Sequence, residues 1–205
     1  MARRPPRFLA ISDGRQSPGA PFRDWVRRLS ASGVDALQVR EKAATDRDRY
    51  ELALEARAAA AGALTLLVNG RADIAIAAGL DGVHLPAAGL PLELLRELLG
   101  SDALIGLSTH HLEEVERAAA EGADYVTFGP VYATPSKAAD GPPVGLAGLA
   151  RAAAAGLPVI ALGGITMERA GECFAAGAHG IAAIRMFARP EALTGLEQLA
   201  RRFRA

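Results

Sequence analysis

The chain has 205 residues, half of them hydrophobic, which suffices for a core without a disulfide or a structural metal. Basic and acidic residues balance at 23 each, which argues against a protein that binds nucleic acid or an anionic membrane. Cys173 is the single cysteine and the longest apolar stretch, 58–68, is too short to cross a membrane, so we expect a cytoplasmic protein.

Short apolar segments alternate with helical patterns along the whole chain. Four stretches repeat one design, in which a helix ends in alanine, a glycine follows, and an apolar strand comes after a short turn. The apolar segments between these stretches predict further strands, and the total reaches eight. In chain order the strands lie in 8–11, 31–39, 64–68, 77–85, 103–107, 120–128, 158–162 and 175–183.

The helical patterns are amphipathic and fall between these strands. One stripe is formed by Trp25, Val26 and Leu29, another by Leu92, Leu95 and Leu99, and Thr45 is placed to cap a helix. Strands that alternate with helices indicate a parallel sheet. Eight such units in a short chain favour a closed (β/α)8 TIM barrel, one domain over 1–205, above an open sheet with free edges.

Polar residues gather where the second predicted strand ends. Gln38 and Arg40 alternate around Val39, so both face the barrel interior, and Lys42 follows at the mouth. Cations at this position suit a phosphate or a pyrophosphate. The alternative is that Arg40 pairs with Glu41 or with a neighbouring helix.

The next three strands also end in polar side chains, and two of these have two interpretations each. His84 is either an interior histidine or a general base, and Thr109 either faces the site or caps the following helix. The adjacent His110 and His111 are rim residues rather than metal ligands, because neighbouring side chains do not share one helix face. The side chains in these strand ends that we carry forward as candidates are Asn69, His84 and Ser108.

Two features follow the last three strands. The connection 130–145 is unusually long and would lie on the C-terminal rim of the barrel, where active sites are found. The pair Gly163 and Gly164, before a helix that opens near Thr166, predicts a phosphate cup made of backbone N–H groups. Arg185 could add a charge to this cup or form a salt bridge with a rim carboxylate.

Six motifs together resemble the thiamine-phosphate synthase and thiazole tautomerase (TenI-like) family over nearly the whole chain. They are QVREK at 38–42, LLVNGRADIA from 66, DGVHL at 81–85, GLSTHHLEE from 106, FGPVYATPSK from 128 and ALGGIT from 161. The resemblance implies a barrel that binds a thiazole phosphate. In the synthase it also implies a hydroxymethylpyrimidine pyrophosphate as second substrate.

The resemblance also assigns residues to two subsites. It implies a pyrophosphate pocket that includes Gln38, Arg40, Lys42 and Asn69, together with Ser108 and a loop carrying Thr134, Ser136 and Lys137. It implies a thiazole phosphate site on Gly163, Gly164 and the backbone near Ile184 and Arg185.

The chain departs from the family pattern at the metal site. Synthases carry two aspartates for Mg2+ where this chain has Gly70 and Gly89, so we expect no cofactor, with Mg2+ only for a synthase. This favours a metal-independent thiazole tautomerase with His84, Ser108 and Lys137 as catalytic candidates. However, the tautomerase pattern has a histidine after the sixth-strand glycine, and Pro130 follows Gly129 here.

Two other functions stay open. One is an active synthase that joins pyrimidine pyrophosphate to thiazole phosphate, with Arg40, Lys42 and Lys137 stabilising the leaving group. The other is a thiazole phosphate binder or regulator without catalysis. A homodimer through the barrel helices is compatible with the sequence, but no apolar stripe requires one.

Overall fold

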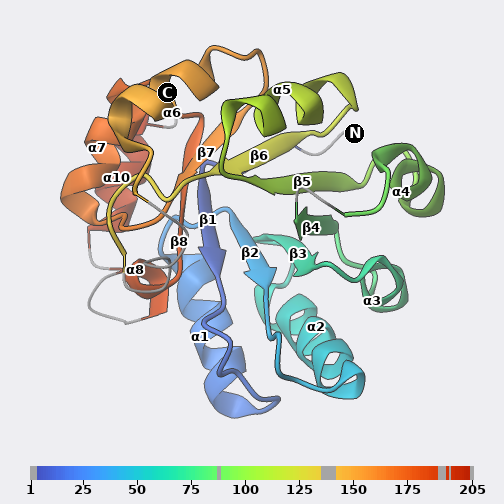
Figure 1. Ribbon diagram of the computed structural model, residues 1–205. Coiled ribbons are helices and arrows are strands. Elements are labelled where there is room, and N and C mark those ends of the chain that lie inside the picture. The colour runs from blue at the N-terminus through green and yellow to red at the C-terminus, as the bar shows by residue number, and fades with distance from the viewer. Residues whose placement is uncertain (1–3, 87–88, 135–141, 189–192, 194, 204–205) are drawn as a thin grey trace.

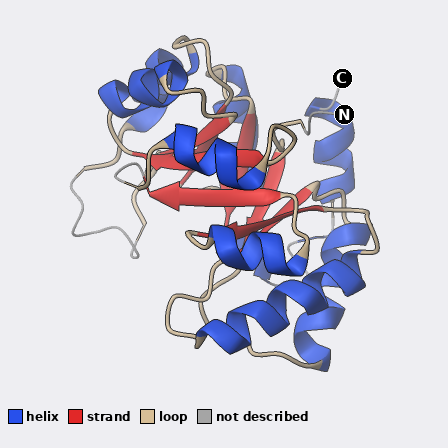
Figure 2. Ribbon diagram, turned by 90° about the vertical axis from the view of Figure 1, so that its right-hand side faces the viewer, coloured by secondary structure: helices blue, strands red, loops and turns tan. Residues whose placement is uncertain are grey.

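The computed structural model describes residues 4–86, 89–134, 142–188, 193 and 195–203. Eight parallel strands pair in chain order, and β8 closes on β1, as the ribbon shows (Figure 1). Helices cover the outside of the strands (Figure 2). The predicted (β/α)8 TIM barrel is therefore confirmed.

Every strand ends within two residues of the end of its predicted segment, and in the four repeated stretches the strand is the second half, after the helix end and the turn. β5 runs to Thr109 because Ser108 and Thr109 still pair with Thr127 and Phe128 of β6. The strands are β1 (Phe8–Ile11), β2 (Ala36–Val39), β3 (Thr65–Asn69), β4 (Gly82–Pro86), β5 (Leu104–Thr109), β6 (Tyr125–Phe128), β7 (Val159–Leu162) and β8 (Gly180–Ala183).

The helices follow the predicted patterns. Thr45 caps α2 by accepting a hydrogen bond from the backbone N–H of Asp48 at 3.1 Å, as expected. The helices are α1 (Ala20–Ala31), α2 (Asp46–Ala60), α3 (Ala72–Ala78), α4 (Leu92–Leu99), α5 (Leu112–Ala120), α6 (Gly145–Ala153), α7 (Met167–Ala175), α8 (Arg185–Ala188) and α10 (Leu196–Phe203). No helix in the described part of the chain is long and apolar enough to cross a membrane.

Thr109 does not cap α5, so that alternative is wrong. Thr109 is buried within β5, and its hydroxyl donates to the carbonyl oxygen of Thr127 at 3.1 Å. The residue before α5 is His111 instead. The strand continues past the predicted end, and this places the start of the helix two residues later.

Two apolar layers build the barrel. The larger one packs the outer faces of the strands against the helices and includes the predicted stripe of Trp25, Val26 and Leu29. Cys173 of α7 is buried in the same layer, as a small hydrophobe. The smaller layer fills the interior and consists of Leu9, Ile11, Ala36, Leu67, Leu104, Tyr125, Ile160 and Ala182.

The interior changes from apolar to polar toward the C-terminal ends of the strands. Two residues beyond Ala36, Leu67 and Tyr125, side chains on the same face are Gln38, Asn69 and Thr127. This alternation places the polar groups at the rim where the active sites of such barrels lie.

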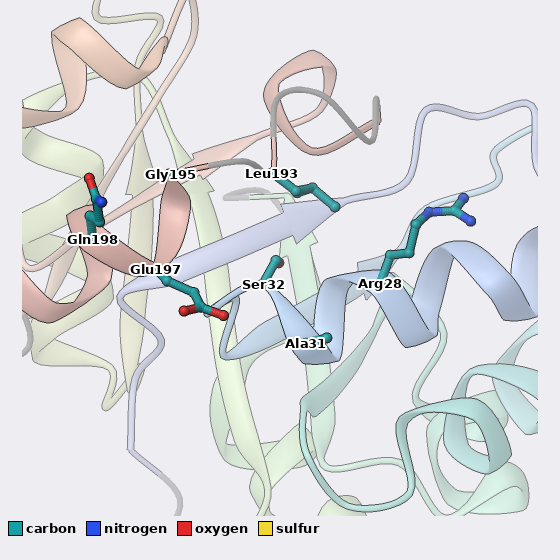
Figure 3. Close-up of a pocket in the computed structure, with 7 residues that line it drawn as sticks. All are labelled: Arg28, Ala31, Ser32, Leu193, Gly195, Glu197 and Gln198. Carbon is teal, nitrogen blue, oxygen red and sulfur yellow. The ribbon is translucent and has the colours of Figure 1, made fainter.

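A cavity of about 410 Å³ lies at the opposite end of the barrel, between α1 and α10 (Figure 3). Its walls include Arg28 and Ser32 at the end of α1 and Glu197 of α10. Helices in this fold run against the direction of the strands, so the end of α1 lies at the N-terminal face of the barrel. None of the predicted site residues lines this cavity.

Candidate functional site

Gln38 and Asn69 lie side by side at the ends of β2 and β3. The side-chain Nε2 of Gln38 donates to Oδ1 of Asn69 at 3.0 Å. Gln38 is buried, and its Oε1 has no hydrogen-bond partner among the described residues. A buried acceptor without a donor costs free energy. The geometry therefore leaves Gln38 Oε1 ready for a donor on a ligand.

Arg40 follows β2 and stands beside this amide pair. Its backbone N–H donates to the Ser12 hydroxyl at 2.7 Å, and its guanidinium is near enough to His84 to lower the pKa of that imidazole. No carboxylate in the described ranges forms an ion pair with Arg40. The expected alternative, a pair with Glu41, is therefore wrong.

Glu41 points away from Arg40 and holds the loop after β1. Its carboxylate accepts a hydrogen bond from the backbone N–H of Gln16 at 3.0 Å. Burial raises the pKa of Glu41, while the hydroxyl of Ser12 acts in the opposite direction. Glu41 therefore has a structural role, and it does not neutralise the charge of Arg40.

The backbone at Lys42 is fixed from the side of α2. Arg49 donates to the carbonyl oxygens of Glu41 at 2.9 Å and of Lys42 at 2.7 Å. The Lys42 side chain itself is exposed. A held backbone with a free ammonium group at the mouth of the barrel suits a multiply charged phosphate ligand.

His84 is the centre of a buried hydrogen-bonded network. Its Nδ1 lies 3.0 Å from the hydroxyl of Tyr125, and its Nε2 lies 2.9 Å from Ser108 Oγ and 3.2 Å from Thr127 Oγ1. Burial, with a smaller effect from Arg40, lowers the pKa of His84 to about 3. Both ring nitrogens are engaged, and the lowered pKa makes the imidazole a weak base near pH 7, so His84 matches an interior histidine better than a general base.

The buried imidazole gives the fold a pH dependence. The pKa of His84 is about 3 in the folded chain and 6.5 for an ordinary histidine, so the unfolded chain binds the additional proton between these values. The free energy of unfolding should therefore fall as pH drops below 6.5, approaching about 1.4 kcal/mol per pH unit from this group. Urea unfolding between about pH 6.5 and 5 measures the slope.

Two variants assign that slope to His84. His84→Gln should flatten it, because glutamine does not titrate. His111→Gln, a substitution of an exposed histidine, should keep it. An equal slope in the His84→Gln variant would show that other groups cause the pH dependence.

The predicted phosphate cup lies at the ends of β7 and β8. Gly163 and Gly164 have φ of 97° and 67°, and an added Cβ would come within 2.6 Å of Pro130 and 2.7 Å of Tyr132. Thr166 caps α7, as predicted, by accepting a hydrogen bond from the backbone N–H of Arg169 at 3.3 Å. Backbone N–H groups before a helix N-terminus are the usual chemistry for binding a phosphate.

Ile184 and Arg185 complete this side of the rim. Ile184 packs against the interior apolar layer, and Arg185 begins α8. The Arg185 guanidinium donates to Thr134 Oγ1 at 2.7 Å, although the two residues are 51 positions apart. In the part of the chain that the structure describes, Arg185 forms no ion pair with a rim carboxylate, contrary to that alternative.

The first part of the long loop after β6 is fastened to α7. Tyr132 donates its hydroxyl to Glu172 at 2.6 Å, and the Arg169 guanidinium lies 4.5 Å from the centre of the Tyr132 ring. Arg169 also donates to the carbonyl oxygen of Gly164 at 2.8 Å. The segment that leads to Thr134 is therefore held in place by α7. Ser136 and Lys137 lie outside the described residues.

The residues at the expected metal positions do not fit Mg2+. Gly70 and Gly89 have no side chain to offer, and two carboxylates at the starts of α2 and α3, Asp46 and Asp73, are bound by Arg71. Hydrogen bonds to Arg71 lower the pKa of both aspartates. Within the described ranges no group of three or more potential ligands could hold a metal ion.

His110 and His111 lie on the rim beside a cavity of about 270 Å³. His110 Nδ1 donates to the carbonyl oxygen of Gly129 at 2.5 Å, which links the loop after β5 to the end of β6. The cavity is otherwise lined by Gly129, Pro130, Pro142, Pro143 and Val144.

Sequence reasoning missed Tyr125, Thr127 and Gly106. All three face the interior, and all lie around His84. The signal was present in the alternation along the sixth predicted strand, in which Tyr125 and Thr127 share a face. It was hidden because the segment reads as a continuous apolar run.

The fold and the rim together define a (β/α)8 barrel whose C-terminal face carries Arg40 and Lys42 after β2 and the glycine pair Gly163 and Gly164 after β7. The sequence pattern of a family described as thiamine monophosphate synthase matches residues 8–187. A thiamine-phosphate synthase of Methanoculleus marisnigri is 44% identical, covering 86% of this chain and 85% of the relative. One of Anaeromyxobacter dehalogenans is also 44% identical, covering 85% and 81%.

A solved structure agrees with these relatives. The thiamine phosphate pyrophosphorylase of Pyrococcus furiosus superimposes with a TM-score of 0.84 at 30% identity, and the match covers 97% of each chain. The chain belongs to the thiamine-phosphate synthase/TenI family.

Proposed function

We propose that this chain is a thiamine-phosphate synthase, which joins a hydroxymethylpyrimidine pyrophosphate to a thiazole phosphate. The observation that carries the proposal is a rim with two halves suited to anions, one made of cationic side chains and one of backbone N–H groups. Arg40 and Lys42 stand at the end of β2, and the backbone cup of Gly163 and Gly164 lies at the end of β7. Two halves suit two phosphorylated substrates, and the relatives named above are synthases.

The tautomerase function favoured from the sequence has less support. It needs a group that takes a proton from the thiazole, whereas burial makes His84 a weak base and both of its ring nitrogens are in hydrogen bonds. Gly129 is followed by Pro130, which offers no base. The synthase needs no general base of this kind, so the available residues fit it better.

The proposed reaction breaks the bond between the pyrimidine methylene carbon and the pyrophosphate oxygen. The thiazole nitrogen supplies the electron pair for the new carbon–nitrogen bond, and pyrophosphate leaves with the electrons of the broken bond. Arg40 and Lys42 would stabilise the charge that develops on the leaving group, with Lys137 as a further candidate. Gln38 Oε1 would accept a hydrogen bond from an amino group of the pyrimidine.

The decisive experiment measures thiamine phosphate formation from the two substrates. Isothermal binding of thiazole phosphate is measured beside it. Turnover at an ordinary enzymatic rate supports the synthase. Tight binding of thiazole phosphate without synthesis would overturn it, and proton exchange on the carboxylated thiazole would then separate a tautomerase from a binder.

The missing carboxylates lead to a prediction about metal. We expect excess chelator to lower turnover by less than about tenfold, because a site without both aspartates has little affinity for Mg2+ to lose. The Gly70→Asp, Gly89→Asp double variant should acquire a dependence on Mg2+ that the natural chain lacks. Turnover with and without chelator, in both proteins, measures the difference.

The structure makes the double variant a fair comparison. An added Cβ at Gly70 meets nothing within 4 Å, although its φ of 71° carries some strain that aspartate tolerates better than most residues. At Gly89 the nearest atom, Pro86 O, would be 3.1 Å away. Complete loss of activity of the natural chain in chelator would contradict the prediction and require other metal ligands.

The expected binding partners and cellular compartment of the chain follow from the same proposal. Its partners would be the two small phosphorylated substrates, and the even charge balance gives no reason to add a nucleic acid or a membrane surface. We propose the cytoplasm as its compartment, because the single cysteine is buried and unpaired.

A further inference from the structure

We propose that Tyr125 is a positioning residue that fixes the tautomer of His84 and thereby makes the Ser108 hydroxyl a hydrogen-bond donor toward the substrate. The arrangement of Tyr125, His84 and Ser108 stands on the structure. Only its last step, contact between Ser108 and a substrate, rests on the proposed function.

Tyr125 reaches His84 across an intervening strand. Tyr125 belongs to β6 and His84 to β4, and Gly106 of β5 is in register with both. A Cβ at Gly106 would come within 2.1 Å of Cζ and 2.4 Å of the hydroxyl oxygen of Tyr125. Because Gly106 has no side chain, the phenol of Tyr125 can pass over β5 and reach His84.

The protons in this network can be placed by counting donors. Tyr125 is fully buried, burial raises the pKa of its phenol, and the hydroxyl therefore keeps its hydrogen. Its hydrogen-bond partner among the described residues is His84 Nδ1, at 3.0 Å. A buried O–H without an acceptor is costly, so Nδ1 accepts. A neutral imidazole has one N–H, so the hydrogen sits on Nε2.

The Nε2–H of His84 then points at two hydroxyl oxygens. Ser108 Oγ lies at 2.9 Å and Thr127 Oγ1 at 3.2 Å. One N–H can be shared between two acceptors, whereas one lone pair on Nε2 would serve two hydroxyl donors poorly. The two hydroxyls together therefore favour the same tautomer as the phenol does.

The tautomer decides what Ser108 can offer a ligand. With hydrogen on Nε2, the Ser108 oxygen accepts from His84 and its own O–H remains for a substrate acceptor, such as a ring nitrogen or a phosphate oxygen. With hydrogen on Nδ1, Ser108 would donate to His84 and present only lone pairs. Tyr125 does not touch the substrate, but it sets the polarity of a group at the end of β5.

The first test reads the tautomer directly. The chain has four histidines, so nitrogen NMR of the histidine-labelled protein, with His84→Gln for assignment, gives a spectrum simple enough to follow His84. We expect a neutral ring protonated at Nε2 near pH 7. In Tyr125→Phe, Nδ1 loses its donor, so its resonance should shift and an Nδ1–H fraction should appear beside the Nε2–H form that Ser108 and Thr127 still favour. A natural protein protonated at Nδ1, or an unchanged spectrum in Tyr125→Phe, would overturn the proposal whether or not the chain is a synthase.

The second test measures the effect on Ser108. Tyr125→Phe should lower kcat/KM for the pyrimidine pyrophosphate by about tenfold, as loss of a supporting hydrogen bond commonly does. In the Ser108→Ala background the same change should have less than about a twofold effect, because the donor it orients is gone. Independent, multiplicative losses would refute the coupling.

Matched measurements separate positioning from folding. Tyr50→Phe removes the same hydroxyl from an exposed position on α2 and should leave kcat/KM and the NMR spectrum unchanged. Urea unfolding of Tyr125→Phe should show a folded, cooperative protein. If no variant or natural protein makes thiamine phosphate, the proposed function fails while the NMR result still decides the tautomer.

Discussion

Arg40→Met is expected to lower kcat/KM for thiamine phosphate formation by about two to three orders of magnitude. Arg40 is held by its backbone to Ser12, has no ion pair in the described part of the chain, and stands beside the Gln38 and Asn69 amides. A guanidinium that binds a pyrophosphate with charge-assisted hydrogen bonds contributes this much when two such bonds are lost. Initial rates at varied pyrimidine pyrophosphate measure the loss.

Two variants accompany this measurement. Arg40→Lys keeps the charge but not the planar fork, so it should recover part of the lost rate. Arg47→Met removes an arginine whose side chain is 87% exposed on α2, and it should have no effect. A rate for Arg40→Met within about threefold of the natural protein would exclude Arg40 from the pyrophosphate site.

Gly106→Ala is expected to destabilise the chain by about 2–3 kcal/mol. The new methyl group would lie 2.1 Å from Tyr125 Cζ, so the buried ring must turn away from His84. The buried network then loses the phenol, and the interior must repack around it. Urea unfolding gives the change in the free energy of unfolding.

The steric explanation has its own controls. Gly171→Ala on α7 meets only Phe203, at 4.0 Å, and should be neutral or slightly stabilising, since alanine favours a helix. Adding Tyr125→Leu to Gly106→Ala should recover part of the stability, because the smaller side chain removes the clash. If the two changes simply add, the clash is not the cause.

The barrel could be predicted because its signal is local and repeated. Each strand and helix is visible in a stretch of about ten residues, and the alternation continues through eight units. The polar ends of β2 to β5 followed from the same alternation. Gln38 and Asn69 were therefore expected on one rim, and they are hydrogen-bonded to each other.

The parts that could not be predicted depend on contacts between distant positions. Tyr132 is hydrogen-bonded to Glu172, and Arg185 to Thr134. These residues are far apart in the sequence, and only the closed barrel brings their loops together. Thr109 was ambiguous for a different reason, since strand ends vary by a residue or two and its pairing with Phe128 is not visible in the sequence. The neutral state of His84 required its burial and its partners.

The glycines of the rim show where this barrel can change during evolution. At Gly163 and Gly164 any side chain would collide with Pro130 or Tyr132, so the two loops around the cup constrain each other and a substitution in one requires a change in the other. At Gly70 the space beyond the backbone is open. A single substitution can therefore add a carboxylate on the β3 side, whereas on the β7 side a new side chain also requires a change at Pro130 or Tyr132.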